Sequence, residues 1–165
     1  MYKRQHVLRV GFHDRAVNQG EITLRFNTRG EVYAATELPI IADSGRLSKP
    51  LGGALTTQFY RAEELGDFVV YAFEVSRDGR YEVSVIATGY SSYATWQVNI
   101  DGEPIGEPID TYSTTLDGAG IERRLGEIAL SAGPHSLRLE VVGHNERSQG
   151  YFIGWDSLVL RPVAR

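Results

Sequence analysis

Two tyrosines three residues apart are the side chains in this sequence best suited to hold a ligand. Tyr90 and Tyr93 lie in the stretch 89–93, Gly-Tyr-Ser-Ser-Tyr, whose composition is typical of a loop. A phenol ring offers a flat apolar face for stacking, carries a polar hydroxyl, and has little side-chain entropy to lose when it is held. The pair therefore suits a ligand with apolar C–H faces and hydroxyl groups. Tyrosines that only close the end of a core are the alternative interpretation.

The stretch 143–151 combines hydrogen-bonding side chains with a further tyrosine. It reads Gly-His-Asn-Glu-Arg-Ser-Gln-Gly-Tyr, so Asn145, Glu146 and Arg147 stand close to Tyr151. Amide, carboxylate and guanidinium groups are planar and form paired hydrogen bonds, which orient a polar ligand. Trp155 follows soon after, and it can belong either to this surface or to the core.

The residue types that enzymes use for catalysis occur here without the spacing that catalysis needs. The histidines form no His-x-x-x-His or His-Glu-x-x-His zinc motif, and no Gly-x-Ser-x-Gly motif is present. Asp and Glu total 21, so acidic pairs arise by chance, and the sequence cannot place Glu127, Glu146 or Asp156 across a cleft. We therefore expect the chain itself not to be an enzyme.

Length and composition describe a single globular domain. The chain has 165 residues, of which 42% are hydrophobic and 23% are charged, so there is enough apolar material for a core. The net charge of −4 and the lack of a long basic run disfavour binding to nucleic acids or anionic membranes. Cysteine is absent, which excludes disulfides and thiolate metal sites.

Glycine and proline interrupt the chain at short intervals, which favours strands and turns over long helices. No stretch without either residue is longer than twelve residues. Apolar and polar residues alternate in the segments 67–75, 81–88, 95–100 and 137–141, and a last apolar strand covers 155–160. One apolar face per strand is typical of antiparallel sheets that pack face to face. The pattern predicts an all-β fold, an antiparallel β-sandwich of two sheets.

The first part of the chain has a less regular pattern. Residues 7–10, 21–26 and 38–41 are expected to form strands, residues 51–54 a loop, and residues 61–65 one helical turn.

The division of the chain follows from this difference in regularity. We expect residues 1–30 to be an N-terminal extension or an added hairpin, and residues 31–165 to be the β-sandwich domain. Residues 1–5, Met-Tyr-Lys-Arg-Gln, resemble the adaptor read-through that often heads proteins translated from metagenome contigs. The true N-terminus, with any export signal, is then expected to be missing.

From about residue 31 to residue 163, the order of the motifs resembles carbohydrate-binding module families 6 and 35, which are jelly-roll β-sandwiches. The first motif reads Gly-Asp-Phe-Val-Val-Tyr at 66–71, followed by Asp-Gly-Arg-Tyr-Glu-Val at 78–83. The second is the hairpin Val-Asn-Ile-Asp-Gly-Glu-Pro-Ile-Gly at 98–106. The third is Ile-Ala-Leu-Ser-Ala-Gly-Pro-His-Ser-Leu at 128–137, with the closing strand Gly-Trp-Asp-Ser-Leu-Val-Leu at 154–160. The resemblance implies a jelly roll that binds a carbohydrate without catalysing a reaction.

In these families, aromatic and polar residues of the loops at one end of the sandwich bind the ligand. The loops that match here are 89–94, 110–120 and 143–154, and Tyr112 stands in the middle one, where the families often have a tryptophan. With the residues named above, the expected ligand-binding residues are Tyr90, Tyr93, Tyr112, Asn145, Glu146, Arg147, Tyr151 and Trp155.

The families also carry a structural calcium ion, held by two glutamates of a Glu-Ala-Glu motif and by an aspartate of the last strand. The matching stretch here is Ala35-Thr36-Glu37, so Glu37 and Asp156 remain and one carboxylate is missing. Because calcium takes about six to eight oxygen ligands, this loss lowers the expected affinity. The resemblance thus implies no required cofactor, with Glu37 and Asp156 as candidate ligands of a structural calcium.

The resemblance also implies a poly- or oligosaccharide partner, a parent enzyme that acts on glycans, and a location outside the cell or in the periplasm. The alternative hypothesis is a structural module that packs against a catalytic domain of the parent protein or self-associates. The stretch 141–152 resembles accessory sandwiches of glycoside hydrolase family 172, which supports this alternative. Ile86, Val142 and Val159 are the outward-facing apolar positions expected to suit such an interface.

Overall fold

The computed structural model describes residues 5–13, 19–27, 30–44, 46–47, 57–116 and 120–163, and side chains over 30–44, 57–116 and 120–163. These residues form β-strands and no helix, so none of them belongs to a helix that could cross a membrane. The strands are β1 (Gln5–His13), β2 (Gln19–Asn27), β3 (Glu31–Ala34), β4 (Ile40–Asp43), β5 (Arg46–Leu47), β6 (Gln58–Arg61), β7 (Phe68–Val75), β8 (Gly79–Ala87), β9 (Ala94–Ile100), β10 (Glu103–Asp110), β11 (Ile121–Leu130), β12 (Gly133–His144) and β13 (Ile153–Pro162).

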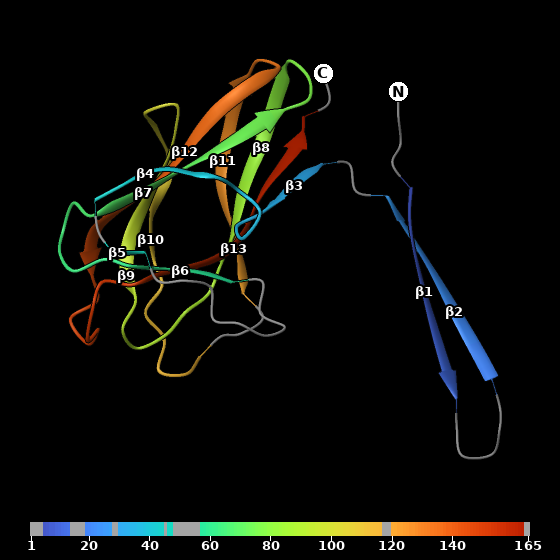
Figure 1. Cartoon of the computed structure of the whole chain (residues 1–165), viewed down its shortest axis with the longest axis horizontal. Helices are drawn as coiled ribbons and strands as arrows, with labels where there is room; N and C mark the ends of the chain where they lie inside the picture. Colours follow the sequence, from blue (N-terminus) through green and yellow to red (C-terminus); the bar gives the residue numbers. More distant parts are fainter. Residues whose placement is uncertain are drawn as a thin grey trace.

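Two antiparallel sheets lie face to face and form the body of the protein (Figure 1). One sheet has the strand order β10-β9-β12-β7-β4. The other has the order β11-β8-β13-β6-β5. In this sheet β3 also pairs with β13, along residues 157–160. The prediction of an all-β, antiparallel sandwich of two sheets is confirmed.

The alternating apolar residues form the core, as their period of two predicts. The inward-facing members of the four predicted strands are all buried: Val69, Tyr71, Phe73, Val75, Tyr81, Val83, Val85, Ala87, Trp96, Val98, Ile100, Leu137, Leu139 and Val141. Full burial of a large apolar side chain contributes roughly 1.5–3 kcal/mol. The two facing stripes are therefore the main source of stability.

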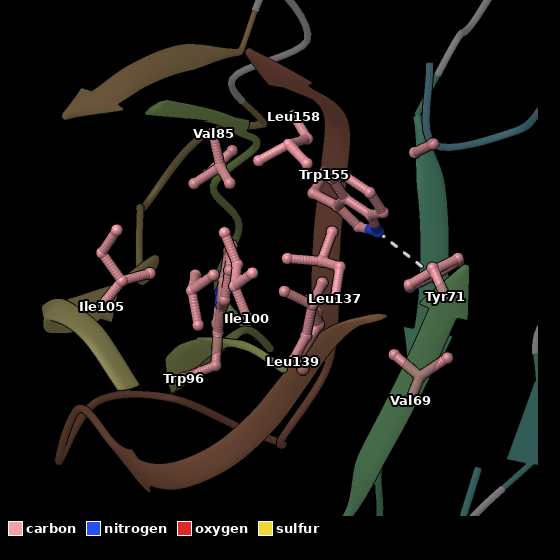
Figure 2. Close-up of a cluster of buried hydrophobic side chains, with 14 of the residues drawn as sticks. Val69, Tyr71, Val85, Trp96, Ile100, Ile105, Leu137, Leu139, Trp155 and Leu158 are labelled. Carbon is pink, nitrogen blue, oxygen red and sulfur yellow. Dashed lines mark hydrogen bonds between the residues drawn. The ribbon is translucent and has the colours of Figure 1, made fainter. Parts of the chain in front are cut away.

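Tyr71 and Trp155 join the two sheets inside this core (Figure 2). Tyr71 belongs to β7 and Trp155 to β13, and neither side chain is accessible to solvent. The indole Nε1–H of Trp155 donates a hydrogen bond of 3.2 Å to the Tyr71 hydroxyl, and the ring centroids lie 4.9 Å apart at 67°. Trp155 is thus a core residue. The expectation that it binds a ligand is corrected, because both sheets cover its ring.

Two local predictions in the first half of the chain are also corrected. Residues 61–65 form no helical turn; the Asp67 carboxylate instead draws this segment into a loop by accepting the backbone N–H groups of Glu63 (2.7 Å) and Glu64 (3.2 Å). These bonds hold the pKa of Asp67 below its ordinary value. The strand expected at 38–41 is β4, which begins after Pro39, a residue without an N–H for the ladder.

The outward-facing apolar positions differ from one another in exposure. Val142 is exposed (45%) and Ile86 is half-buried, but Val159 is only 5% exposed. Val159 lies in the middle of its sheet, between Val32 of β3 and Ser84 of β8. Neighbours on both sides cover it, so its expected role in an interface is corrected.

β1 and β2 form a separate antiparallel sheet and pair only with each other (Figure 1). The strands expected at 7–10 and 21–26 are therefore confirmed. The assignment of residues 1–30 and 31–165 to separate units stays a prediction. The loop expected at 51–54 lies outside the described residues.

His135 links two turns at the end of the sandwich where β9 joins β10. Its Nδ1 lies 2.6 Å from the Asp101 carboxylate, and its Nε2 lies 2.9 Å from the Ser131 carbonyl oxygen. Both partners are acceptors, and only the imidazolium form can donate from both ring nitrogens, so this arrangement favours the charged ring. Partial burial opposes this charge, but the hydrogen bonds to Asp101 and Ser131 outweigh it and raise the pKa of His135. Burial likewise opposes the charge of Asp101, but the bonds from His135 and Ser136 lower its pKa.

Replacing Trp155 by Phe is expected to lower the free energy of unfolding by about 2–3 kcal/mol. The change removes buried ring atoms and takes away the donor to the Tyr71 hydroxyl. Urea denaturation measures the loss. The control Val142→Ala trims an exposed side chain and should change stability by less than about 0.5 kcal/mol. A Trp155→Phe protein as stable as the wild type would contradict the role of the indole between the sheets.

The His135–Asp101 pair should stabilise the fold only within a window of pH. Its contribution is complete between the ordinary pKa values of the two groups, about 3.9 for Asp and about 6.5 for His. It is lost as the pH rises through the raised folded-state pKa of His135, and as the pH falls through the lowered pKa of Asp101. Because the Asp101 carboxylate is 46% exposed, we expect the contribution to be about 1 kcal/mol.

Denaturant unfolding of the wild type and of Asp101→Asn at about pH 5.5 and about pH 9 measures this contribution. Asn tolerates the left-handed conformation that Asp101 adopts (φ 53°), so the turn is kept. The wild type should be the more stable protein at the lower pH, with the difference shrinking at the higher one. An equal difference at both values would refute a charged pair.

Candidate functional site

Three connections lie side by side at one end of the sandwich. The N–H of Tyr90 donates to the Thr111 carbonyl at 3.2 Å, and the N–H of Phe152 donates to the Ser92 carbonyl at 3.0 Å. The connection after β8 is thus the middle one, bonded to both others. The loops that the resemblance assigned to one end of the sandwich are therefore neighbours. They are residues 88–93 between β8 and β9, 111–120 between β10 and β11, and 145–152 between β12 and β13, described here except for 117–119.

Tyr90 presents a ring to solvent from the middle connection. Its side chain is 42% exposed. Several large hydrophobic side chains are exposed in the described part of the protein, and Tyr90 is the aromatic one among them. Tyr112 of the next connection forms a parallel backbone bridge with Tyr90 and is half-buried. The N–H of Tyr112 donates to the Asp110 carboxylate at 2.9 Å. The backbone on both sides of the exposed ring is therefore held in place.

Tyr93 does not share this exposure, which corrects the expectation that it stacks on a ligand. The residue is only 3% exposed, and burial raises the pKa of its hydroxyl to about 12. Its ring packs edge to face against Tyr90 on one side (6.3 Å between centroids) and against Phe59 of β6 on the other (6.2 Å). Phe59 was not among the residues predicted to belong to the site. Its only signal was a short run of bulky residues, Gln-Phe-Tyr-Arg, without a regular alternation around it.

Trp96 anchors the connection after β10 from inside the core. The ring is fully buried, and its Nε1–H donates to the Thr111 hydroxyl at 3.2 Å. That hydroxyl in turn donates to the Ala94 carbonyl at 2.7 Å. The first residue of this connection is thus tied to both the core and the start of β9.

Asn145 holds the connection after β12, and its amide is engaged within the protein. Its Nδ2 donates to the Asp110 carboxylate at 3.0 Å, and its Oδ1 accepts the N–H of Arg147 at 3.1 Å. Asp110, which the sequence analysis did not single out, is the shared partner of Asn145 and Tyr112. Asn145 is therefore a residue that joins two loops.

The remaining predicted residues lie along the same connection. Glu146 and Arg147 are exposed, and Tyr151 is half-buried with its ring 4.9 Å from that of His144. The guanidinium of Arg61, at the end of β6, lies 5.7 Å from the centroid of the Phe152 ring, within reach of a cation–π contact. The loop end thus offers one open ring, flanked by exposed charged side chains.

Glu37 and Asp156 do not assemble a calcium site in the described part of the protein. Glu37 is exposed in the turn after β3, whereas Asp156 is half-buried at a bulge of β13 and accepts the Thr57 hydroxyl at 2.5 Å. Among the described residues, no group of three or more His, Asp or Glu side chains could hold a metal ion. Two carboxylates supply fewer oxygen atoms than the roughly six to eight that calcium takes.

Two shallow hollows lie elsewhere on the described surface. One, on the outer face of β8, β11 and β13, is lined by Glu82, Glu122, Arg124 and Arg161. These charges pair with one another, for example Arg124 with Glu82 at 3.0 Å and Arg161 with Glu122 at 2.5 Å. The other lies around the Asp101–His135 pair. Paired charges of this kind neutralise each other, so the open ring at the loop end remains the stronger candidate.

No protein-family model and no curated protein matches the chain. Its structure is similar to part of a Paenibacillus xanthan lyase, with a TM-score of 0.72 at 18% sequence identity. That similarity covers 99% of this chain but only 18% of the lyase chain.

Isolated carbohydrate-binding modules are similar over almost their whole length. A family 35 module from an environmental isolate has a TM-score of 0.55 at 18% identity, covering 82% of this chain and 98% of the module. A family 36 module of a multidomain xylanase from the hindgut metagenome of Trinervitermes trinervoides has a TM-score of 0.53 at 16% identity, covering 82% and 99%. At such identities the likeness concerns the fold. The chain has the jelly-roll β-sandwich fold of carbohydrate-binding modules of families 35 and 36.

Proposed function

We propose that the chain is a non-catalytic carbohydrate-binding module whose ligand stacks on Tyr90. The observation that carries the proposal is a 42% exposed phenol ring on a loop whose backbone is bonded to both neighbouring connections. A sugar ring has an apolar C–H face that suits an aromatic face, and a rim of hydroxyls that suits charged and amide groups. A ring held in place before binding loses little freedom when the ligand arrives.

The roles of the other side chains follow from their positions. Glu146 and Arg147 are exposed on the neighbouring connection, where they would take hydrogen bonds from, or give them to, the hydroxyls of a bound sugar. Tyr112 and Tyr151, both half-buried, would border the ligand. Asn145 and Tyr93 are assigned to the support of the site, because their polar or ring surfaces are already used.

A site with a single stacking ring predicts weak binding. Its small contact area is wet, and binding has to offset the lost freedom of a flexible glycan. Dissociation constants from micromolar to millimolar are expected, corresponding to about 4–8 kcal/mol. Such affinities suit a module that keeps an enzyme near a polymer.

The partner and the location are part of the same proposal. The solved structures named above include a xanthan lyase and a module of a xylanase, which by their names act on polysaccharides. They support a poly- or oligosaccharide ligand, a parent enzyme with its own catalytic domain, and a location outside the cell or in the periplasm.

Tyr90→Ala should abolish binding on a glycan array and leave the midpoint of thermal unfolding nearly unchanged, because the ring is exposed. Tyr90→Phe, which keeps the ring, should retain most of the affinity. Ile41→Ala serves as the matched control, since Ile41 is similarly exposed (59%) on the edge strand β4. Binding that survives Tyr90→Ala would place the site elsewhere.

The glycan array is repeated with added calcium and with a chelator. This comparison tests whether glycan binding requires a calcium ion held by Glu37 and Asp156. Among the described residues, Glu37 and Asp156 are part of no group of three or more His, Asp or Glu side chains that could hold a metal ion, so we expect binding not to depend on the ion. Binding that disappears with the chelator would show that the ion contributes after all.

A second hypothesis, an assembly module, is favoured by one observation. The N–H of Gly66 donates to the Val141 carbonyl at 2.8 Å, which places the exposed Leu65 close to the exposed Val142. Size-exclusion chromatography with light scattering separates the two hypotheses. A stable oligomer that binds no glycan would favour assembly, and a monomer that binds glycan would favour the module.

A further inference from the structure

The exposed ring of Tyr90 packs against the buried ring of Tyr93. Tyr93 is 3% exposed and lies between Tyr90 and Phe59, with interplanar angles of 76° and 71°. Its backbone is fixed as well, since its N–H donates to the Tyr90 carbonyl at 3.2 Å and its carbonyl accepts the Ser148 hydroxyl at 2.8 Å. The orientation of Tyr90 therefore depends on where Tyr93 lies.

Gly154 of β13 leaves the space that the Tyr93 ring occupies. A Cβ atom at this position would lie 2.6 Å from Cε2 and 2.9 Å from the hydroxyl of Tyr93, and 2.3 Å from Oγ1 of Thr88. Each distance is shorter than real Cβ contacts allow. Gly154 lies within a regular strand and is not among the glycines with positive φ. The requirement for glycine is thus one of space and not of backbone conformation.

We infer that Gly154 and Tyr93 are positioning residues of the binding surface. The missing side chain at 154 lets the Tyr93 ring lie inside the protein, and the edge of that ring holds Tyr90 in its exposed orientation. The consequence for glycan binding rests on the proposed function, whereas the position of the Tyr93 ring does not. Gly154 thus determines which of the two loop tyrosines faces solvent.

The position of the Tyr93 ring can be measured without any glycan. Tetranitromethane modifies accessible tyrosines, and tandem mass spectrometry of the tryptic peptide separates Tyr90 from Tyr93. In the wild-type full chain, Tyr90 should be nitrated and Tyr93 protected. In Gly154→Ala, Tyr93 should be nitrated at a rate close to that of Tyr90. Protection of Tyr93 in a folded Gly154→Ala protein would overturn the inference.

Gly143→Ala is the matched control. Gly143 lies at the end of β12, and a Cβ there would meet only the Cβ of Thr95, at an ordinary 3.6 Å. This variant should show the wild-type nitration pattern. Exposure of Tyr93 in Gly143→Ala as well would show that any added methyl group loosens this end of the protein, and would refute a specific role of Gly154.

Two further variants separate the neighbours of Gly154. Thr88→Ala combined with Gly154→Ala removes the contact with Oγ1 of Thr88 and leaves the contact with Tyr93, so Tyr93 should still be exposed. Return to the wild-type pattern would assign the effect to Thr88 and overturn the role of Tyr93. Should Gly154→Ala not fold, Phe59→Leu tests the same inference from the opposite side, since it removes the ring that supports Tyr93. Tyr93 is then expected to become reactive, and continued protection would refute the inference.

Glycan affinity completes the test. Gly154→Ala should weaken the binding of a glycan found on the array by about tenfold or more, and Gly143→Ala should leave it unchanged. A wild-type protein that binds no glycan would refute the proposed function, and the nitration pattern would still decide the position of the ring. Exposure of Tyr93 with unchanged glycan affinity would refute the link between Tyr93 and Tyr90.

Discussion

The contact between Tyr71 and Trp155 is the constraint on which the two-sheet arrangement depends. It joins β7 of one sheet to β13, the middle strand of the other, through a hydrogen bond and an edge-to-face ring contact. Both groups are polar at one atom, so burial is tolerated only because each satisfies the other. The contact therefore defines how the sheets lie on each other. The apolar residues around it provide the bulk of the free energy but not this geometry.

Hydrogen bonds to the core and between the loops hold the loop end in place. Trp96 reaches from the core to Thr111, Asp110 joins Asn145 to the backbone of Tyr112, and backbone bonds connect the three loops. Loops without such bonds would sample many conformations and would lose more entropy on binding. What remains exposed at this end is the ring that the packing beneath it does not use. The ligand binding that we propose would thus take place on the surface of a well-packed end.

Charged side chains on the outside of the sandwich are paired in two places. On the outer face of β8, β11 and β13, arginines and glutamates are paired. At the opposite end from the loops, the acceptors that face both nitrogens of His135 favour its charged form. In each case a charged group lies against a partner of opposite charge or a hydrogen-bond acceptor, so its charge is compensated locally. Among the exposed large hydrophobic residues that the structure describes, Tyr90 at the loop end is the aromatic one.

The alternation of apolar and polar residues was enough to predict the sandwich. A strand places successive side chains on opposite faces, so the stripes of β7, β8, β9 and β12 could be assigned to the core from their spacing. The loops could be assigned to one end from the order of the motifs. The short strands β3 and β6 could not be predicted, because four residues carry too little periodicity.

The identity of the exposed ring could not be decided from the sequence. Tyr90 and Tyr93 have the same side chain, lie in the same loop and are equally suited to stacking. The neighbours that separate them, Phe59 and Gly154, come from β6 and β13, which are distant in the chain and meet only in the folded protein. The sequence alone determined the long alternating strands β7, β8, β9 and β12, their buried faces and the polar loops, because these follow from local periodicity and composition. Only the tertiary structure decided which tyrosine is buried and which is open, because burial depends on the atoms that other strands bring to the same place.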